Sequence, residues 1–179
     1  MDSALRDNWG ESALIAPLEQ KPRGEADFEL IELMFFAYRD FIGDADHLLE
    51  NFGLGRAHHR VLHFVTRRPG LAIAELLDIL KITKQSLNRV LKLLLDQNYV
   101  VAVPGESDRR QRRLFPSPRG EALALDVARL QSKRFARVFA GLPDGARDGA
   151  RALLRAMIDP GERCKVEALV GAPTRERAS

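Results

Sequence analysis

The sequence of 179 residues has little of what secreted, membrane-embedded or metal-built proteins depend on. A single cysteine, Cys164, excludes an internal disulfide framework and a zinc site made of cysteines within one chain. No run reaches the ~18 consecutive apolar residues of a membrane helix. The start of the chain carries acidic side chains and no apolar core, unlike a secretory signal. We therefore expect a cytoplasmic protein that makes no membrane contact.

Sequence motifs of common enzyme classes are also missing. The chain has no Gly-x-x-x-x-Gly-Lys-Ser/Thr loop, no Gly-x-Ser-x-Gly and no His-Glu-x-x-His. Gly-Leu-Gly at residues 53–55 lacks the third glycine and the preceding strand that dinucleotide binding requires. His59 and His63 are spaced to share a helix face, but a complete set of metal ligands is not evident nearby. We expect no enzymatic activity, no cofactor and no metal.

Charge is abundant and unevenly distributed along the chain. Residues 1–52 carry 4 Lys+Arg and 12 Asp+Glu, a net charge of −8, whereas residues 53–120 carry 13 and 5, a net of +8. The remaining residues have a net charge of +3. A basic block between less basic flanks indicates an anionic partner, of which nucleic acid is the commonest. An acidic protein surface is the alternative that charge alone leaves open.

Apolar periodicity predicts a mainly helical chain with one small β-hairpin. The expected helices cover residues 28–51, 57–67, 73–80, 83–95, 120–139 and 144–158, and the expected strands cover 99–103 and 113–115. Thr83 is a good N-cap for the fourth helix, and Asn98 suits a left-handed residue after it. The tip of the hairpin is charged, with four Arg between residues 108 and 113.

Three successive helices followed by a basic hairpin are the order of a winged helix-turn-helix domain, whose second turn helix lies in the major groove of DNA. When Leu87 is placed on the buried side of the helix that Thr83 begins, several hydrogen-bonding side chains face outward. They are Lys84, Gln85, Ser86, Asn88, Arg89 and Lys92. Such side chains can contact bases and phosphates. A solvated surface helix carries the same residue types. DNA binding is therefore favoured by the helix together with the basic hairpin that follows it, and not by the helix alone.

The segment from Asp108 to Gly120 (Asp-Arg-Arg-Gln-Arg-Arg-Leu-Phe-Pro-Ser-Pro-Arg-Gly) resembles the wing signature of the MarR family of bacterial transcriptional regulators. In that signature, Asp-x-Arg is followed by a strand, a Thr or Ser, and a Gly. The stretch from Thr83 to Leu94 is similar to the family's recognition helix, and Asn98-Tyr99-Val100 stands where the family often has Gly-Leu/Tyr-Val. The resemblance covers residues 52–120 and implies a winged helix-turn-helix domain with a helical dimerisation layer.

The resemblance implies roles for the wing. Arg110 would enter the minor groove, Asp108 would orient it, and Arg109 and Arg112 would lie near phosphates. Two departures from the family pattern matter. Ala102 replaces an Arg that leads into the wing in many members, so one backbone contact is expected to be missing. Pro116 replaces an aliphatic residue, which predicts a short returning strand because proline cannot donate to the ladder.

The resemblance also implies a homodimer and, in many members, a small aromatic or lipophilic effector bound between the dimer layer and the DNA-binding lobes. The candidate pocket residues are Phe35, Tyr38, Phe41, His59 and Phe64. An aromatic stripe at helical spacing is also typical of a core, so the residues alone leave both interpretations open.

The expected organisation has five parts. An arm (1–24) precedes a dimerisation region (25–52 and 121–158), which flanks the DNA-binding domain (53–120), and a tail (159–179) follows. The expected function is a sequence-specific regulator that binds double-stranded DNA as a homodimer and responds to a small molecule. The alternatives are an architectural DNA-binding protein with little base discrimination and a basic protein-interaction module.

Overall fold

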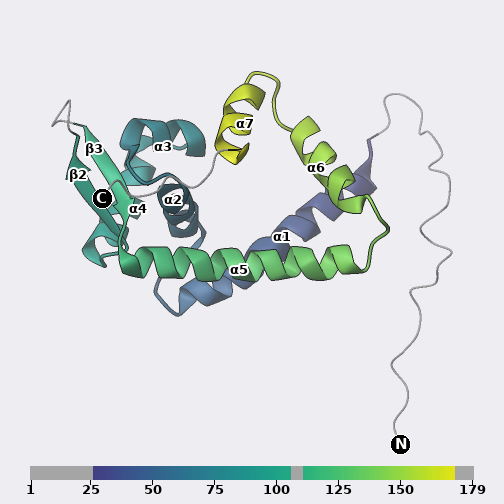
Figure 1. Cartoon of the computed structure of the whole chain (residues 1–179), viewed down its shortest axis with the longest axis horizontal. Coiled ribbons are helices and arrows are strands. Elements are labelled where there is room, and N and C mark those ends of the chain that lie inside the picture. Colours follow the sequence, from purple (N-terminus) through teal and green to yellow (C-terminus); the bar gives the residue numbers. More distant parts are fainter. Residues whose placement is uncertain (1–25, 106–110, 172–179) are drawn as a thin grey trace, which may run out of the picture. The chain divides into compact units, whose positions relative to one another are not determined.

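The structure is a computed structural model that describes residues 26–105 and 111–171. Figure 1 shows its helices and strands, which are α1 (Phe28–Glu50), α2 (Arg56–Arg67), β1 (Leu71–Ala72), α3 (Ile73–Leu80), α4 (Lys84–Asp96), β2 (Val100–Pro104), β3 (Arg112–Pro116), α5 (Pro118–Ala140), α6 (Ala146–Ala156) and α7 (Arg163–Gly171). All six predicted helices and both predicted strands are present. The predicted fold class, mainly α with a small β-hairpin, is confirmed.

The chain divides into two compact units after Phe36, within helix α1. The first unit contributes the beginning of α1, and the second contains everything from Ala37 onward. Among the described residues, even the 23-residue helices α1 and α5 lack an apolar stretch that could cross a bilayer.

The sheet of the second unit has three antiparallel strands in the order β1-β3-β2. Strand β3 lies in the middle, with Leu71 of β1 opposite Leu114 and with Ala102 of β2 opposite the same residue. Leu114 is fully buried, whereas Val101 and Val103 of β2 are exposed. The sheet therefore uses one face to extend the core, as expected for a small antiparallel sheet.

The core below the sheet is built from the apolar faces of α2, α3 and α4. Leu62, Leu76, Leu87 and Leu94 are almost fully buried, and Tyr99 joins them at the start of the hairpin. Leu87 and Leu94 are spaced to share one side of α4. Because α4 commits this side to the core, its opposite side is left for solvent or a partner.

Local signals in the sequence place the ends of α4. The Thr83 side chain accepts a hydrogen bond from the Ser86 amide at 3.2 Å, which confirms it as the N-cap. After the helix, Asn98 adopts φ +56°, the left-handed conformation predicted for it. Both ends of the helix are thus defined by residues that could be identified from the sequence.

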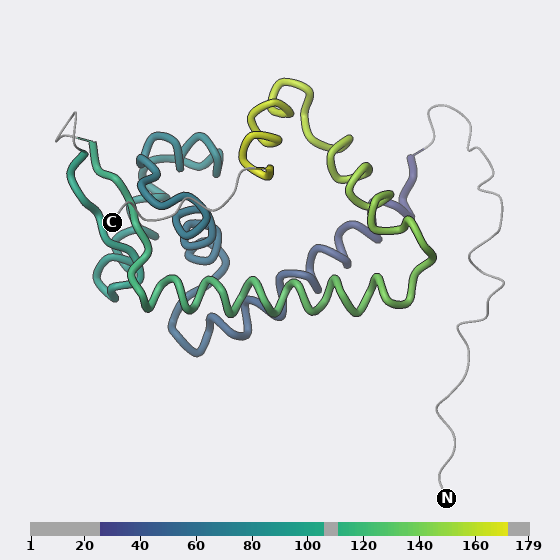
Figure 2. Tube along the Cα trace, viewed as in Figure 1, coloured from purple at the N-terminus to yellow at the C-terminus, as the bar shows by residue number. Residues whose placement is uncertain are grey.

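Three features differ from the prediction or were missed by it. Strand β1 has only two residues, too few to show an alternating pattern, and is defined by its pairing with β3. Pro116 remains in register with Val100 and ends β3, which is as long as β2, so the expected shortening of the returning strand was wrong. Helix α7 occupies part of the stretch expected to be a tail. The chain turns back after α5 so that α7 lies beside α2 and α3 (Figure 2).

Candidate nucleic-acid interface

The outer side of α4 is the first part of the candidate interface. The side chains predicted to face outward from this helix are all exposed, whereas Leu87, Val90, Leu91 and Leu94 are buried. The predicted orientation of the helix is therefore confirmed. A helix that projects polar side chains away from a helix-turn-helix core has the arrangement needed for reading a major groove.

The outward side chains of α4 differ in what they already contact. Ser86 belongs to the N-cap, where its hydroxyl accepts a hydrogen bond from Thr83 Oγ1 at 2.9 Å. Lys92 Nζ lies 2.9 Å from Asp96, and this hydrogen bond raises the pKa of the ammonium group. By contrast, four side chains form no hydrogen bond or ion pair with any other residue that the structure describes. They are Lys84, Gln85, Asn88 and Arg89.

A groove of about 630 Å³ connects the start of α4 with the wing. Lys84 lines it from α4 and Arg112 lines it from β3, together with Gln111, Arg113 and residues at the beginning of α3. Two residues assigned to DNA from separate sequence patterns therefore meet at one groove. Its arginine and lysine side chains suit a phosphate backbone, because cations neutralise phosphates and release counterions.

Arg113 is a further cation at this groove, and it is anchored rather than free. Its guanidinium lies 3.3 Å from the Glu75 carboxylate and donates to the Gly70 carbonyl at 3.3 Å. Glu75 also accepts a hydrogen bond from the Ala72 amide at 2.7 Å, so one carboxylate caps α3 and holds the wing strand. Glu75 was not among the residues predicted for the site. Its position in the first turn of α3 was a weak signal for capping.

The junction between the hairpin and α5 holds the other side of the wing. Ser117 caps α5 by accepting a hydrogen bond from Gly120 N at 3.0 Å, and its hydroxyl donates to the Asn98 carbonyl at 2.6 Å. Arg119 stacks over the Tyr99 ring at 4.3 Å and donates to the Tyr99 hydroxyl at 2.8 Å. The end of α4, the hairpin and α5 are joined in this way through side chains of the signature segment.

The remaining wing candidates are Asp108, Arg109 and Arg110, which lie outside the described residues. Their assignment to DNA stays a prediction. Arg112 is the member of the predicted wing set that the structure describes, and its side chain is exposed.

The candidate effector residues have different surroundings. Phe35 and Tyr38 are exposed on α1, whereas the ring of Phe41 lies 5.2 Å from that of Phe135 on α5. Phe64 contacts the ring of His63 and lines a hollow of about 290 Å³ beside the end of α7. The effector pocket stays a prediction, for which Phe64 has the most suitable surroundings.

The three histidines of α2 are explained by packing and capping. His58 Nδ1 accepts a hydrogen bond from the Gly55 amide at 3.1 Å, which caps the helix. Burial lowers the pKa of His59 and of His63, whose rings meet edge to face at 6.3 Å. Across residues 26–105 and 111–171, no group of three or more His, Cys, Asp or Glu side chains could hold a metal ion.

Comparisons with known proteins point to the same function as this geometry. Residues 52–111, which include the helix-turn-helix and the first strand of the hairpin, match the sequence model of the MarR family. The HTH-type transcriptional regulator PetP of Rhodobacter capsulatus is 40% identical over 154 residues, covering 86% of this chain and 89% of PetP. The chain belongs to the MarR family. It is therefore a DNA-binding transcriptional regulator and not an enzyme.

Solved structures agree with the fold of this MarR-family regulator. A MarR transcriptional regulator from Methanosarcina mazei Go1 is 26% identical, with a TM-score of 0.63 over 78% of this chain and 99% of its own. The Rv2887 protein of Mycobacterium tuberculosis, solved with p-aminosalicylic acid, is 25% identical, with a TM-score of 0.53 over 72% of this chain and 97% of its own. The winged helix-turn-helix architecture is shared with both.

Proposed function

We propose that this MarR-family regulator reads a two-fold DNA site as a homodimer. Helix α4 of each protomer enters a major groove, and Arg110 of the wing enters the adjacent minor groove. The groove shared by Lys84 and Arg112 carries this proposal, because it makes one basic path from the reading helix to the wing. A dimer of this kind contacts half-sites about one helical turn, or ~34 Å, apart.

The contacts of the α4 side chains support a division of roles. Gln85, Asn88 and Arg89 have exposed donors that no described residue uses, and such groups can pair with base edges. Lys84 and Arg112 line the groove and are assigned to phosphates. Lys92 is held by Asp96, so its contribution to DNA binding is expected to be smaller.

Exposed apolar side chains support the homodimer. Leu153 and Leu154 of α6, and Met157 directly after this helix, are 58%, 53% and 57% exposed. Helix α1 adds a second group, consisting of Phe28, Leu30, Ile31, Leu33, Met34, Phe35, Phe36 and Tyr38. Monomeric proteins rarely leave so much apolar surface in water, and a second copy of the chain presents the same surfaces for burial.

An effector is proposed on the basis of the family. The Rv2887 protein was solved with p-aminosalicylic acid, and the hollow beside Phe64 combines apolar and cationic side chains. A small lipophilic molecule at this hollow would contact α2 and α7 together.

We also propose that the protein is cytoplasmic, because a bacterial transcriptional regulator acts on DNA in the cytoplasm.

Replacing Arg89 and Arg112 separately with alanine tests the division of roles. Arg89→Ala is expected to cost roughly 1–3 kcal/mol at the preferred site and to relax the preference at one base position. Arg112→Ala is expected to weaken binding equally on all sequences and to reduce the salt dependence by about one phosphate contact. Fluorescence anisotropy against a set of single-base variants of the site, at several salt concentrations, measures both effects.

Arg89 and Arg112 serve as controls for each other, since both substitutions remove one exposed positive charge. A uniform loss for Arg89→Ala across all duplexes would assign Arg89 to a phosphate. If Arg112→Ala changed the base preference instead, the proposed roles would have to be exchanged.

A further inference from the structure

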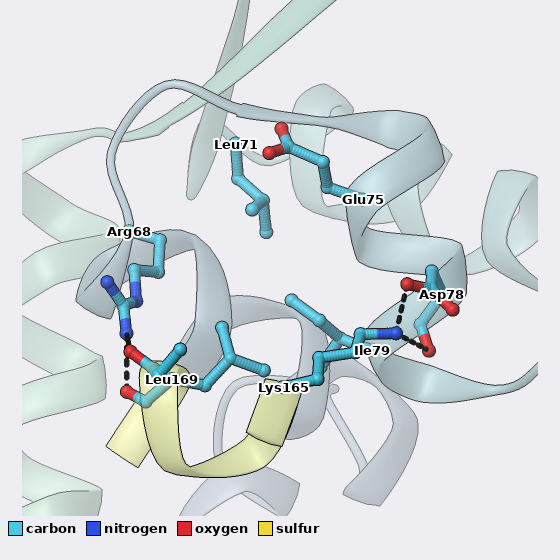
Figure 3. Close-up of a pocket in the computed structure, with 8 residues that line it drawn as sticks. Arg68, Leu71, Glu75, Asp78, Ile79, Lys165 and Leu169 are labelled. Carbon is cyan, nitrogen blue, oxygen red and sulfur yellow. Dashed lines mark hydrogen bonds and ion pairs between the residues drawn. The ribbon is translucent and has the colours of Figure 1, made fainter. Parts of the chain in front are cut away.

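Helix α7 is attached to α3 by a cluster of ion pairs. Figure 3 shows Lys165 of α7 reaching Asp78 of α3, and Lys165 Nζ also lies 3.7 Å from Glu162. Glu162 in turn accepts a hydrogen bond from Lys81 Nζ at 3.1 Å, and Lys81 pairs with Asp78 at 3.0 Å. The four side chains alternate in charge around a closed ring. The Lys165 ammonium, followed by that of Lys81, holds the pKa of Asp78 below its usual range.

A second attachment joins the end of α7 to the end of α2. Arg68 is 8% exposed, and its guanidinium donates to the main-chain carbonyls of Ala168, at 3.1 Å, and Leu169 (Figure 3). These carbonyls belong to the last turn of α7, where the helix dipole favours a positive charge. Arg68 therefore acts as a cationic cap for a helix that is distant in sequence.

These attachments are polar, and little apolar packing supports them. No residue of α7 is fully buried. A hollow of about 350 Å³ remains between the helices, lined by Leu71, Ile79, Lys165 and Leu169 among others. Exposed ion pairs contribute little to stability in water and are weakened by salt. Helix α7 can therefore detach while the core of the DNA-binding domain stays folded.

Both attachments lie next to elements that carry the reading surface. Lys81 adopts φ +51° at the end of α3, in the turn that leads to Thr83 and the first residues of α4. Arg68 precedes Pro69 and Gly70, and the Gly70 carbonyl receives the Arg113 side chain of the wing. A displacement of α7 would thus reach the start of the reading helix and the base of the wing.

We propose that α7, together with Glu162 directly before it, is a clamp. Glu162 and Lys165 are its positioning residues for DNA binding, because they hold the α3–α4 turn in its reading geometry. This inference rests on the proposed use of α4 for reading DNA. Docking of α7 favours DNA binding, so DNA must favour docking by the same factor, as thermodynamic linkage requires. The clamp residues need not touch DNA themselves.

The native Cys164 provides a direct probe of docking. It is the single cysteine of the chain, and its side chain is exposed on α7 next to Lys165. A nitroxide spin label attached there reports the mobility of α7 in the full-length protein by electron paramagnetic resonance. Lys165→Glu is expected to increase the mobile fraction of the label, whereas Lys165→Arg, which keeps the ion pairs, is expected to resemble the wild type.

Binding of duplex DNA is measured with the same variants. Lys165→Glu is expected to bind duplex DNA about 5-fold or more weakly than Arg129→Glu does. Lys165→Arg is expected to bind it with an affinity close to that of the wild type. Arg129→Glu is the matched control, because it changes the net charge equally at an exposed residue that pairs within α5. Saturating DNA is expected to reduce the mobile fraction in Lys165→Glu. Thermal unfolding verifies that each variant is folded, and Glu162→Gln replaces Lys165→Glu if the latter is not.

Two results would overturn the clamp. The first is a spin label at Cys164 that is as immobile in folded Lys165→Glu, or in Glu162→Gln if that variant replaces it, as in the wild type. The second is a released α7 with an affinity no lower than that of Arg129→Glu. The label measurement without DNA does not depend on how α4 reads bases, so a failure of the proposed function would be seen separately.

Discussion

Replacing Gly120 with alanine is expected to lower the free energy of unfolding by about 3 kcal/mol or more. A Cβ atom at this position would lie 1.9 Å from the carbonyl oxygen of Tyr99, a main-chain atom that cannot move aside as a flexible side chain would. Relief of this contact would require α5 to move away from the start of β2. The same movement would lengthen the hydrogen bond from the Ser117 hydroxyl to the Asn98 carbonyl.

Urea denaturation followed by circular dichroism, at a fixed protomer concentration, measures this effect. Gly149→Ala is the matched control, because Gly149 lies in helix α6 and a Cβ atom added there would meet no atom within 4 Å. That substitution is expected to raise stability by about 0.5–1 kcal/mol, since alanine is the better helix former. Equal stability of Gly120→Ala and the wild type would contradict the close approach of α5 to the hairpin.

Introducing a charge at Leu153 is expected to separate the proposed homodimer and to reduce its affinity for a two-half-site duplex by about 100-fold or more. Leu153 is 58% exposed on α6 and lies beside Leu154 in a group of apolar side chains that we assign to the dimer. Leu153→Glu would place an unpaired carboxylate in that interface, which costs far more than the same charge in water. A monomer contacts one half-site at a time and loses the gain from linked binding.

Sedimentation velocity gives the oligomeric state, and anisotropy gives the affinity at the same protein concentration. Ala152→Glu is the control, because Ala152 is exposed on the side of α6 opposite to this apolar group. It is expected to leave both measurements close to the wild type. A dimeric Leu153→Glu variant with unchanged affinity would remove α6 from the proposed interface.

The parts of the fold that could be predicted are those with local signals. Leu87 and Leu94 repeat at the helical period, Thr83 caps α4, and Asn98 follows its end, so this helix and its outer side could be predicted from the sequence alone. The groove between the start of α4 and the wing was not predicted. Its two sides, marked by Lys84 and Arg112, are brought together by strand pairing and core packing rather than by a local pattern.

The parts that were missed depend on contacts between distant residues. Strand β1 exists because Leu71 pairs with Leu114, and no two-residue stretch predicts such a pairing. Helix α7 is held by polar contacts to Arg68 and Asp78, so it lacks the apolar stripe that reveals a packed helix. Capping of α3 by Glu75 uses a main-chain amide and was equally hidden from residue periodicity.

Selection of duplexes from a random DNA library by the purified protein, at about 0.15 M salt, tests the central claim most directly. We expect a palindromic site with half-sites about 10 bp apart, bound about 10³-fold more tightly than scrambled DNA. Binding of all duplexes with similar affinity and a steep salt dependence would contradict sequence-specific reading by α4 and would indicate an architectural protein.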